Sequence, residues 1–234
     1  MAYRGQIKGF PLIKIKSRDI IEKMQKGSFY MNSLRYYRKL YENSKDEVIG
    51  DPYEGKLFIP EAYLMIEGET PIPLKNEALR TSHEDDFVFC MFGVNPVKYS
   101  TFQFTEEQKE KLIGFDDTTL LITDTVEFRK RVFDAARKEG LEIREGFVQY
   151  YDPSVNSPDI YSLYARLING MENIVFHKRI QYQYQQEYRF TVSQPIGGVY
   201  VEHRELNIGD ISDISEIFTT KEFLSKARII NEKQ

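Results

Sequence analysis

The segment from residue 177 to residue 192 alternates between polar and apolar side chains, and this alternation limits what it can fold into. Its even positions are mostly aromatic or aliphatic, and its odd positions carry Gln181, Gln183, Gln185, Glu187, Arg189 and Thr191. Because strand side chains point alternately to two faces, we predict a continuous strand with one polar and one aromatic face. A carboxylate, a guanidinium and several amides in a row are typical of a strand that lines a polar site.

Helix and strand signals alternate irregularly along the rest of the chain. Strands are predicted at residues 28–31, 56–59, 62–67, 87–94, 118–123, 146–151, 197–206 and 208–214. Because strands come partly in runs and partly between helices, we predict a single α+β domain over residues 1–234. Its sheet is expected to be mixed or mostly antiparallel, with short helices on its flanks.

Several predicted helices have recognisable ends. One helix lies between Ser17 and Gly27, and others begin near Ser33, Thr105, Asp124, Pro158 and Thr219. Thr105 with Gln108, and Thr219 with Glu222, have the spacing of capping boxes. The helix after Pro158 is predicted to present a continuous apolar stripe formed by Ile160, Leu163, Tyr164, Leu167, Ile168 and Met171.

Composition excludes several classes of protein. The chain has 234 residues, of which 41% are hydrophobic and 29% charged, with a net charge of −4. That charge argues against non-specific binding to nucleic acid or to an acidic membrane. Cys90, the single cysteine, lies in an apolar run, so we predict a buried, inert thiol and no internal disulfide. With neither a signal peptide nor an apolar run of about 20 residues, we expect a cytoplasmic protein that does not span a membrane.

The common catalytic and cofactor motifs are absent from the sequence. It contains neither a glycine-rich phosphate loop nor the glycine-flanked serine of a nucleophile elbow. His83, His177 and His203 are scattered, so no metal site is predicted.

Gln185-Gln186-Glu187 resembles the Gln-x-Glu or Glu-x-Glu strand of ADP-ribosyltransferases. The resemblance implies that Glu187 stabilises oxocarbenium-like charge on the ribose of NAD, that Gln185 orients the acceptor and that Tyr30 stacks on nicotinamide. The alternative is that Glu187 and Arg189 form an in-strand or cross-strand ion pair worth roughly 0.2–1 kcal/mol.

Tyr3-Arg4-Gly5 resembles the first-strand motif of the same superfamily, which implies that Arg4 contacts NAD. The sequence departs from the superfamily in two ways: about a dozen residues separate Arg4 from the next helix, and no Ser-Thr-Ser triplet follows. Lys14 or Lys16 in the alternating run at 12–16 is the alternative first-strand cation.

Two further groups of charged residues are candidates for ligand binding. Arg35, Arg38 and Lys39 share one face of a predicted helix, where they suit a phosphate or form a solvated basic face. Asp51 and Glu54 lie in a predicted turn that suits a ribose or a metal, although a plain turn is the simpler interpretation.

Several segments together resemble an uncharacterised bacterial and phage family, a domain of unknown function, over roughly residues 12–195. The similar segments are the strand 27–31, the turn 50–54, and the residues Phe176, Lys178, Tyr184, Glu187, Tyr188 and Arg189. This sequence lacks the Asn that precedes Asp51 in that family and has Gln185 where a Glu is common. The resemblance implies a shared site made of Tyr30, Asp51, Glu54, Lys178, Glu187 and Arg189, and it implies no particular chemistry.

The leading hypothesis is a cytosolic nucleotide-handling protein that acts on NAD or a related nucleotide in an ADP-ribosyltransferase-like manner. As an enzyme it would transfer an ADP-ribosyl group or hydrolyse a nucleotide. Its catalytic residues would be Glu187, Gln185 and Tyr30, and its ligand-binding residues Arg4, Arg35, Arg38, Asp51, Glu54, Lys178 and Arg189. The alternative is a non-catalytic binding protein, phage-encoded or part of host defence, that sequesters a nucleotide signal or a partner protein. A third interpretation is a Tyr-rich interaction module without a small-molecule site.

Overall fold

An eight-stranded sheet forms the centre of the computed structural model, which describes residues 7–45, 50–58, 62–64, 67–68, 70, 72–74, 78–79, 81, 83–98, 101–154, 158–194 and 199–230. Its main path runs β10-β13-β7-β1-β9-β15, and β2 joins β7 to β14. Every pairing described in this sheet is antiparallel. The strands are β1 (Leu12–Lys16), β2 (Ser28–Ser33), β7 (Phe87–Gly93), β9 (Thr118–Ile122), β10 (Ile143–Phe147), β13 (Glu187–Val192), β14 (His203–Asn207) and β15 (Ser215–Thr219).

Short helices flank this sheet, which confirms the predicted α+β class. They are α1 (Arg18–Gln25), α2 (Leu34–Ser44), α3 (Glu106–Ile113), α4 (Thr125–Lys138), α5 (Pro158–Ile168) and α6 (Thr220–Lys226), with 3₁₀ turns η1 (Ile174–Phe176), η2 (Ile180–Gln185) and η3 (Ser212–Ile214). In the described part of the chain, no helix combines the length and apolarity needed to cross a bilayer.

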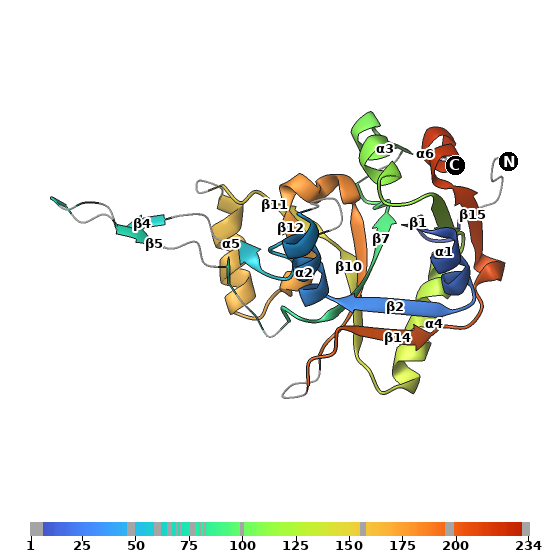
Figure 1. The fold of residues 1–234 in the computed structure, drawn as a ribbon, viewed down its shortest axis with the longest axis horizontal. Helices are drawn as coiled ribbons and strands as arrows, with labels where there is room; N and C mark the ends of the chain where they lie inside the picture. The colour runs from blue at the N-terminus through green and yellow to red at the C-terminus, as the bar shows by residue number, and fades with distance from the viewer. Residues whose placement is uncertain are drawn as a thin grey trace.

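Pairs of short strands complete the fold. Strands β11 (Gln149–Tyr151) and β12 (His177–Arg179) pair in parallel. The antiparallel pairs are β8 (Thr101–Gln103) with β16 (Arg228–Ile230), β3 (Leu57–Phe58) with β6 (Ala78–Leu79), and β4 (Ala62–Leu64) with β5 (Ile72–Leu74). The β4–β5 pair projects away from the body of the protein (Figure 1).

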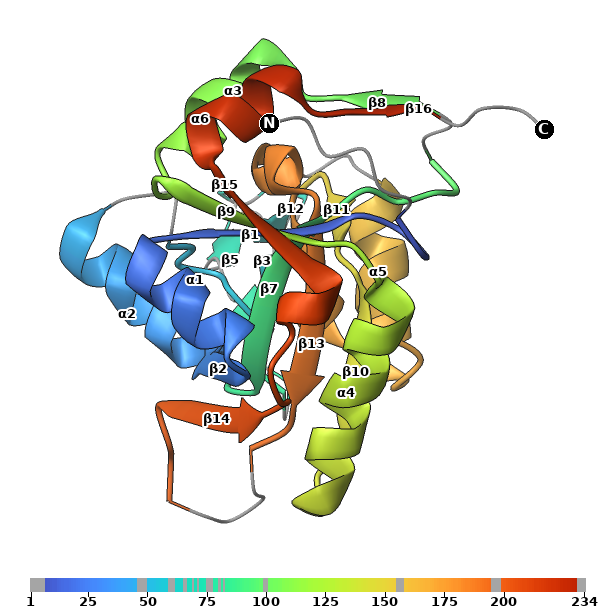
Figure 2. The same cartoon turned by 90° about the vertical axis from the view of Figure 1, so that its right-hand side faces the viewer.

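Apolar clusters cover both faces of the sheet around β1. Leu12 belongs to a cluster that includes residues of α1 and α4, whereas its neighbour Ile13 belongs to one that includes residues of α3 and α6. Accordingly, α3 and α6 lie on one side of β1 and β9, and α1 and α4 lie on the other (Figure 2). The first cluster is strongly aromatic, with the Phe29 and Phe89 rings stacked at 4.1 Å between centroids.

The sheet is split along one edge of β7. β1 pairs with Phe92 and Gly93 at one end of this edge, and β2 pairs with Phe87 and Val88 at the other. Among the described residues, the stretch 89–91 therefore has no strand partner on this edge, although β13 pairs with β7 along its whole opposite edge. Figure 2 shows β7 running between β1 and β2, which diverge from it.

The prediction of one continuous strand over residues 177–192 is wrong. The segment forms β12, then the 3₁₀ turn η2, and only then β13. Gln186 separates η2 from β13 with a left-handed backbone, φ 39° and ψ 51°, and its N–H donates to the Gln183 carbonyl at 3.2 Å. All six residues of β13 are buried, because both faces of this strand are covered.

Helix ends confirm the prediction in one case and not in another. Thr105 and Gln108 form both bonds of a capping box at α3. α6 begins after Thr219 as predicted, but among the described residues the Thr219 side chain makes no cap bond, so the second capping box is wrong. On α5, Ile160, Leu163 and Leu167 are buried, whereas Tyr164 and Ile168 are exposed. Met171 is also exposed and lies beyond the end of the helix, so the buried stripe is narrower than predicted.

Candidate functional site

A cleft of about 740 Å³ opens where the sheet splits, and we call it the sheet cleft. Its volume lies within the range of roughly 300–1,000 Å³ typical of small-molecule sites. Its lining includes residues of β1, α1, β2, α2, β7, β12 and β13. Among the described lining residues, the five cations Lys14, Lys16, Lys23, Lys178 and Arg189 outnumber the three carboxylates Glu54, Glu187 and Glu205.

A buried network of four charged side chains, the charged floor, forms one wall of the sheet cleft. Lys178 Nζ lies 2.7 Å from Glu187 Oε1 and 3.2 Å from Glu54 Oε2. The Arg189 guanidinium binds the same two carboxylates, with Nε 2.7 Å from Glu187 Oε2 and Nη2 2.7 Å from Glu54 Oε1. Each carboxylate therefore bridges both cations, and the four charges balance.

Glu187 and Lys178 stay ionised in the charged floor because they face groups of opposite charge. Burial opposes the charged form of Glu187, but the charges of Arg189 and Lys178 outweigh it and hold the pKa of this carboxyl well below its usual range. Burial likewise opposes the charge of Lys178, yet Glu187 and Glu54 raise the pKa of its amine well above the usual value. Burying charges is tolerable only when they are paired this closely.

Backbone contacts fix the charged floor in place. Arg189, which is 1% exposed, donates through Nη1 to the Val175 carbonyl at 2.6 Å. The Glu187 N–H donates to the Tyr150 hydroxyl at 2.9 Å. Gln185 Oε1 accepts from Lys178 Nζ at 2.7 Å. Gln185 and Glu187 thus meet at Lys178, but they do not share one strand face as predicted, because Gln185 belongs to η2 and Glu187 to β13.

The ion pair of Glu187 with Arg189, the alternative predicted from sequence, is therefore present. This in-strand pair is buried, and its two members also bind Lys178 and Glu54. Its members are adjacent odd positions of one strand, which explains why their side chains lie on one face. Val88 and Cys90 of β7 and the turn that carries Glu54 lie beside them on the lining of the cleft.

Lys14 enters the sheet cleft from β1 at the split. Its Nζ donates to the Cys90 carbonyl at 2.5 Å and lies 4.3 Å from the centroid of the Phe89 ring. A side-chain amine thus occupies one of the hydrogen-bonding positions that a neighbouring strand would fill. Burial lowers the pKa of Lys14 to about 8. Burial also raises the pKa of the adjacent Cys90 thiol to about 12, as expected for an inert cysteine.

Tyrosines line the part of the sheet cleft formed by β2 and α2. Tyr30, the predicted nicotinamide-stacking residue, is 44% exposed, and its ring stacks on His203 at 5.0 Å between centroids. Tyr36 and Tyr37 on α2 are half-buried and meet edge to face. Burial raises the pKa of the Tyr37 hydroxyl far above its ordinary value, so it stays protonated.

Asp51 and Glu54 share one turn but bind different partners. Glu54 belongs to the charged floor, whereas Asp51 is buried outside the lining and pairs with Arg179 at 2.8 Å. Asp51 also accepts from the Tyr53 N–H at 2.9 Å. The Arg179 guanidinium lies over the Tyr53 ring, 4.7 Å from its centroid. Asp51 therefore stabilises the turn and does not face the cleft.

The prediction that Arg35 and Arg38 form a free phosphate site conflicts with their contacts, because both bind Asp85. Arg38 is 6% exposed and donates to the carbonyls of Glu54 and Glu84, each at 2.6 Å, and to Asp85 at 2.5 Å. Arg35 pairs with Asp85 and lies over the Tyr200 ring, 4.1 Å from its centroid. The described lining of the sheet cleft includes neither arginine.

The resemblance to the uncharacterised family implies all four residues of the charged floor, but the sequence predicts a role for only some of the other cations on the sheet cleft. Lys14 and Lys16 were alternatives for a first-strand cation, while Lys23 was not singled out. The alternation of Leu12 to Lys16 was the available signal, since it puts both lysines on one face of a strand. Arg4 lies outside the described residues.

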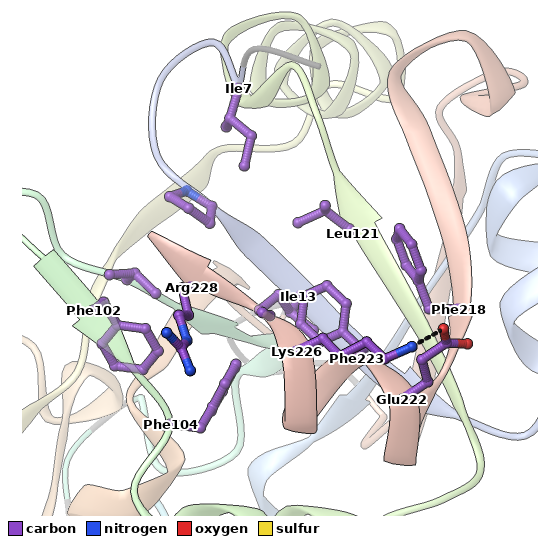
Figure 3. Close-up of a pocket in the computed structure, with 13 residues that line it drawn as sticks. Ile7, Ile13, Phe102, Phe104, Leu121, Phe218, Glu222, Phe223, Lys226 and Arg228 are labelled. Atoms are coloured by element: carbon purple, nitrogen blue, oxygen red, sulfur yellow. Dashed lines mark hydrogen bonds and ion pairs between the residues drawn. The ribbon is translucent and has the colours of Figure 1, made fainter. Parts of the chain in front are cut away.

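A second pocket, of about 180 Å³, lies between α6 and the β8–β16 pair (Figure 3). Its walls are aromatic, with Phe102, Phe104 and Phe223 among them, and Lys226 pairs with Glu222 at 2.8 Å beside it. Its volume is too small for a nucleotide. Elsewhere in the described ranges, no group of three or more His, Cys, Asp or Glu is arranged to hold a metal ion.

Comparison with known proteins adds no relative: no family model, curated protein or solved structure matches this chain. The resemblances to ADP-ribosyltransferases and to the uncharacterised phage and bacterial family therefore stay predictions.

Proposed function

We propose that the sheet cleft binds a nucleotide, such as NAD or a related compound. The carrying observation is the excess of cations on a cleft of about 740 Å³ in a chain whose net charge is −4. Such a local excess attracts an anionic ligand against the field of the whole molecule. Lys16 and Lys23 supply charges for phosphate oxygens, and the exposed face of Tyr30 supplies a surface for a base.

Binding without turnover is the form of this proposal that the geometry favours. ADP-ribosyl transfer would require the Glu187 carboxylate to face the positive charge that develops on the ribose. Both oxygens of Glu187 already bind cations, one Lys178 and the other Arg189. A carboxylate neutralised in this way stabilises a second cation only weakly. A protein that sequesters a nucleotide signal needs no such free carboxylate.

Calorimetry and thermal unfolding with NAD, ADP and adenosine test the proposal. A ligand present at about 100 times its Kd stabilises the folded protein by about 2.7 kcal/mol, so binding raises the Tm. We expect Lys16→Gln to weaken ADP binding. Lys221→Gln makes the same change at an exposed residue of α6 outside the cleft and should leave ADP binding unaltered. If none of the three ligands raises the Tm or releases heat, the proposal is wrong.

Chromatography after incubation with NAD separates binding from transfer. We expect intact NAD in the presence of a ligand-dependent rise in Tm. Release of nicotinamide by the wild type, lost in Glu187→Asp, would instead support the ADP-ribosyltransferase hypothesis. Glu187→Asp is the appropriate variant because it keeps the charge that Lys178 and Arg189 require.

A further inference from the structure

The sheet cleft holds two lysine amines in opposite electrostatic surroundings, that of buried Lys178 and that of half-buried Lys14. Lys178 Nζ is bound by Glu187 and Glu54 of the charged floor. Lys14 Nζ binds a neutral carbonyl, that of Cys90, and an aromatic ring, that of Phe89. Among the described residues, no carboxylate lies within ion-pair distance of Lys14, although the lining of the cleft includes three carboxylates. Lys178 is therefore kept as a cation, whereas Lys14 is surrounded by groups that accept a neutral amine.

We propose that Lys14 is a nucleophilic amine that captures the carbonyl group of an anionic aldehyde or ketone in the sheet cleft as an imine. The Cys90 carbonyl accepts one N–H of Lys14, which leaves the nitrogen lone pair of the neutral amine available to the cleft. Lys16 lies two residues further along the same strand face and supplies a cation for the ligand's phosphate or carboxylate. The inference rests on the same cleft as the proposed function but not on a nucleotide as its ligand.

The ionisation of Lys14 supports this assignment. Burial lowers its pKa to about 8, with smaller opposing influences from Cys90 and Glu187 and a reinforcing one from Lys16. At pH 7 an amine with this pKa is about one-tenth neutral, whereas an ordinary lysine with a pKa of about 10.4 is neutral to about 0.04%. Desolvated lysines of this kind form Schiff bases with carbonyl substrates in other proteins.

The reaction balances without a further reagent. The Lys14 nitrogen attacks the carbonyl carbon, and a proton moves from nitrogen to oxygen to give a carbinolamine. The carbon–oxygen bond then breaks, and the two protons of the amine leave with the oxygen as water. The product is a carbon–nitrogen double bond between Lys14 and the ligand, which hydride reduction converts into a stable secondary amine.

Pyridoxal 5′-phosphate followed by borohydride reduction tests the proposal, since this probe combines an aldehyde, an aromatic ring and a phosphate. Peptide mass spectrometry of the wild type at pH 7 gives the modified fraction of each lysine. We expect Lys14 to be labelled at least about tenfold more than Lys23, an exposed lysine of the same cleft, because burial lowers the pKa of the Lys14 amine. Equal labelling of Lys14 and Lys23, or labelling spread over surface lysines, would overturn the proposal.

Two further arms keep the outcome interpretable. Lys14→Arg should lose the dominant adduct, and Lys221→Arg, a change at an exposed lysine outside the sheet cleft, should keep it. The wild-type map decides the matter even if Lys14→Arg fails to fold. NAD added before the probe separates the two proposals. Labelling of Lys14 that NAD suppresses supports both, whereas labelling that NAD leaves unchanged supports the amine and counts against nucleotide binding in this cleft.

Discussion

The charged floor makes Glu187 a structural residue at the scale of a single side chain. Removing one partner of a buried ion pair leaves an uncompensated buried charge, which costs about 3–5 kcal/mol. We expect Glu187→Gln to lower the free energy of unfolding by an amount in this range, because Lys178 and Arg189 each lose half of their carboxylate contacts. Urea denaturation at pH 7 measures the loss.

Asp213→Asn is the matched control for this change. Asp213 pairs with Arg131 at 2.7 Å, but its side chain is 59% exposed, so the same exchange of carboxylate for amide should cost no more than about 1 kcal/mol. Equal losses in the two variants would show that burial adds nothing to the pairing of Glu187.

The pH dependence of stability should also report on Glu187. Burial acts to raise the folded pKa of Glu187, but the charges of Arg189 and Lys178 hold it below the ordinary value of 4.5. A depressed pKa gives stability that is present above the unfolded value and is lost as the pH falls toward the folded one. We therefore expect the wild type to lose stability more steeply than Glu187→Gln as the pH falls below 4.5. Parallel curves from urea denaturation between about pH 3 and pH 6 would contradict this.

Lys14 gives a dependence of the same sign in a separate window at alkaline pH. Burial lowers its pKa from 10.5 to about 8, so between these values the unfolded chain binds a proton that the folded protein does not. Stability therefore rises with pH across this window. We expect the wild type to gain unfolding free energy relative to Lys14→Met as the pH rises from 8 to 10.5. A constant difference would show that the Lys14 amine is fully solvated.

At the scale of single elements, the two predicted capping boxes provide a paired test. The Thr105 side chain accepts from the Gln108 N–H at 3.1 Å, and the Thr105 N–H donates back to the Gln108 side chain at 3.1 Å. We expect Thr105→Ala to destabilise the protein by about 1 kcal/mol, within the usual range of about 0.5–2 kcal/mol for a lost cap. Thr219→Ala should cost clearly less, because Thr219 forms no cap bond among the described residues. Thermal unfolding of both variants checks the difference in Tm.

Most elements could be predicted because their sequence signals are local. The predictions that failed concern features that no local signal determines. A capping residue or a stop such as Gly27, with φ 107°, acts within a few residues of itself. Alternation predicts one strand over residues 177–192, but the left-handed backbone of Gln186 separates η2 from β13. Nothing in the residue types near Gln186 announces that conformation. The apolar stripe of α5 was similarly too broad, because periodicity does not say how much of a helix face finds a partner.

At the scale of the whole molecule, the sheet cleft combines segments that are far apart in the sequence. Strand β1, the turn that carries Glu54, and strand β13 meet only because the sheet places them together. The Glu187–Arg189 pair could be predicted, since two residues on one strand share a face. Glu54 and Lys178 enter the prediction only through the family resemblance, because their place beside that pair depends on packing that spacing along the chain does not encode. The burial of Arg38 beside Asp85 depends on the same kind of packing.

The charge distribution predicts how salt affects binding. The chain carries a net charge of −4, while cations exceed carboxylates on the sheet cleft. An anionic ligand is therefore attracted only near the cleft, by cations that solvent ions can screen. Raising the ionic strength from 0.01 M to 0.15 M shortens the screening length from about 30 Å to about 8 Å. We expect the affinity for ADP to fall over this range and that for adenosine to change little. Calorimetry that shows equal salt dependence for both would contradict a cationic cleft.

The split along β7 also makes one backbone amide an observer of the cleft. The N–H and C=O of a strand residue point to the same edge, so the Cys90 amide faces the gap into which its carbonyl receives Lys14. Amides elsewhere in β7 lie in paired ladders and exchange with deuterium only through larger openings of the sheet. We expect the Cys90 amide to exchange as water enters the gap. Its exchange rate, compared with those of its neighbours, thus reports whether water or a ligand occupies the cleft.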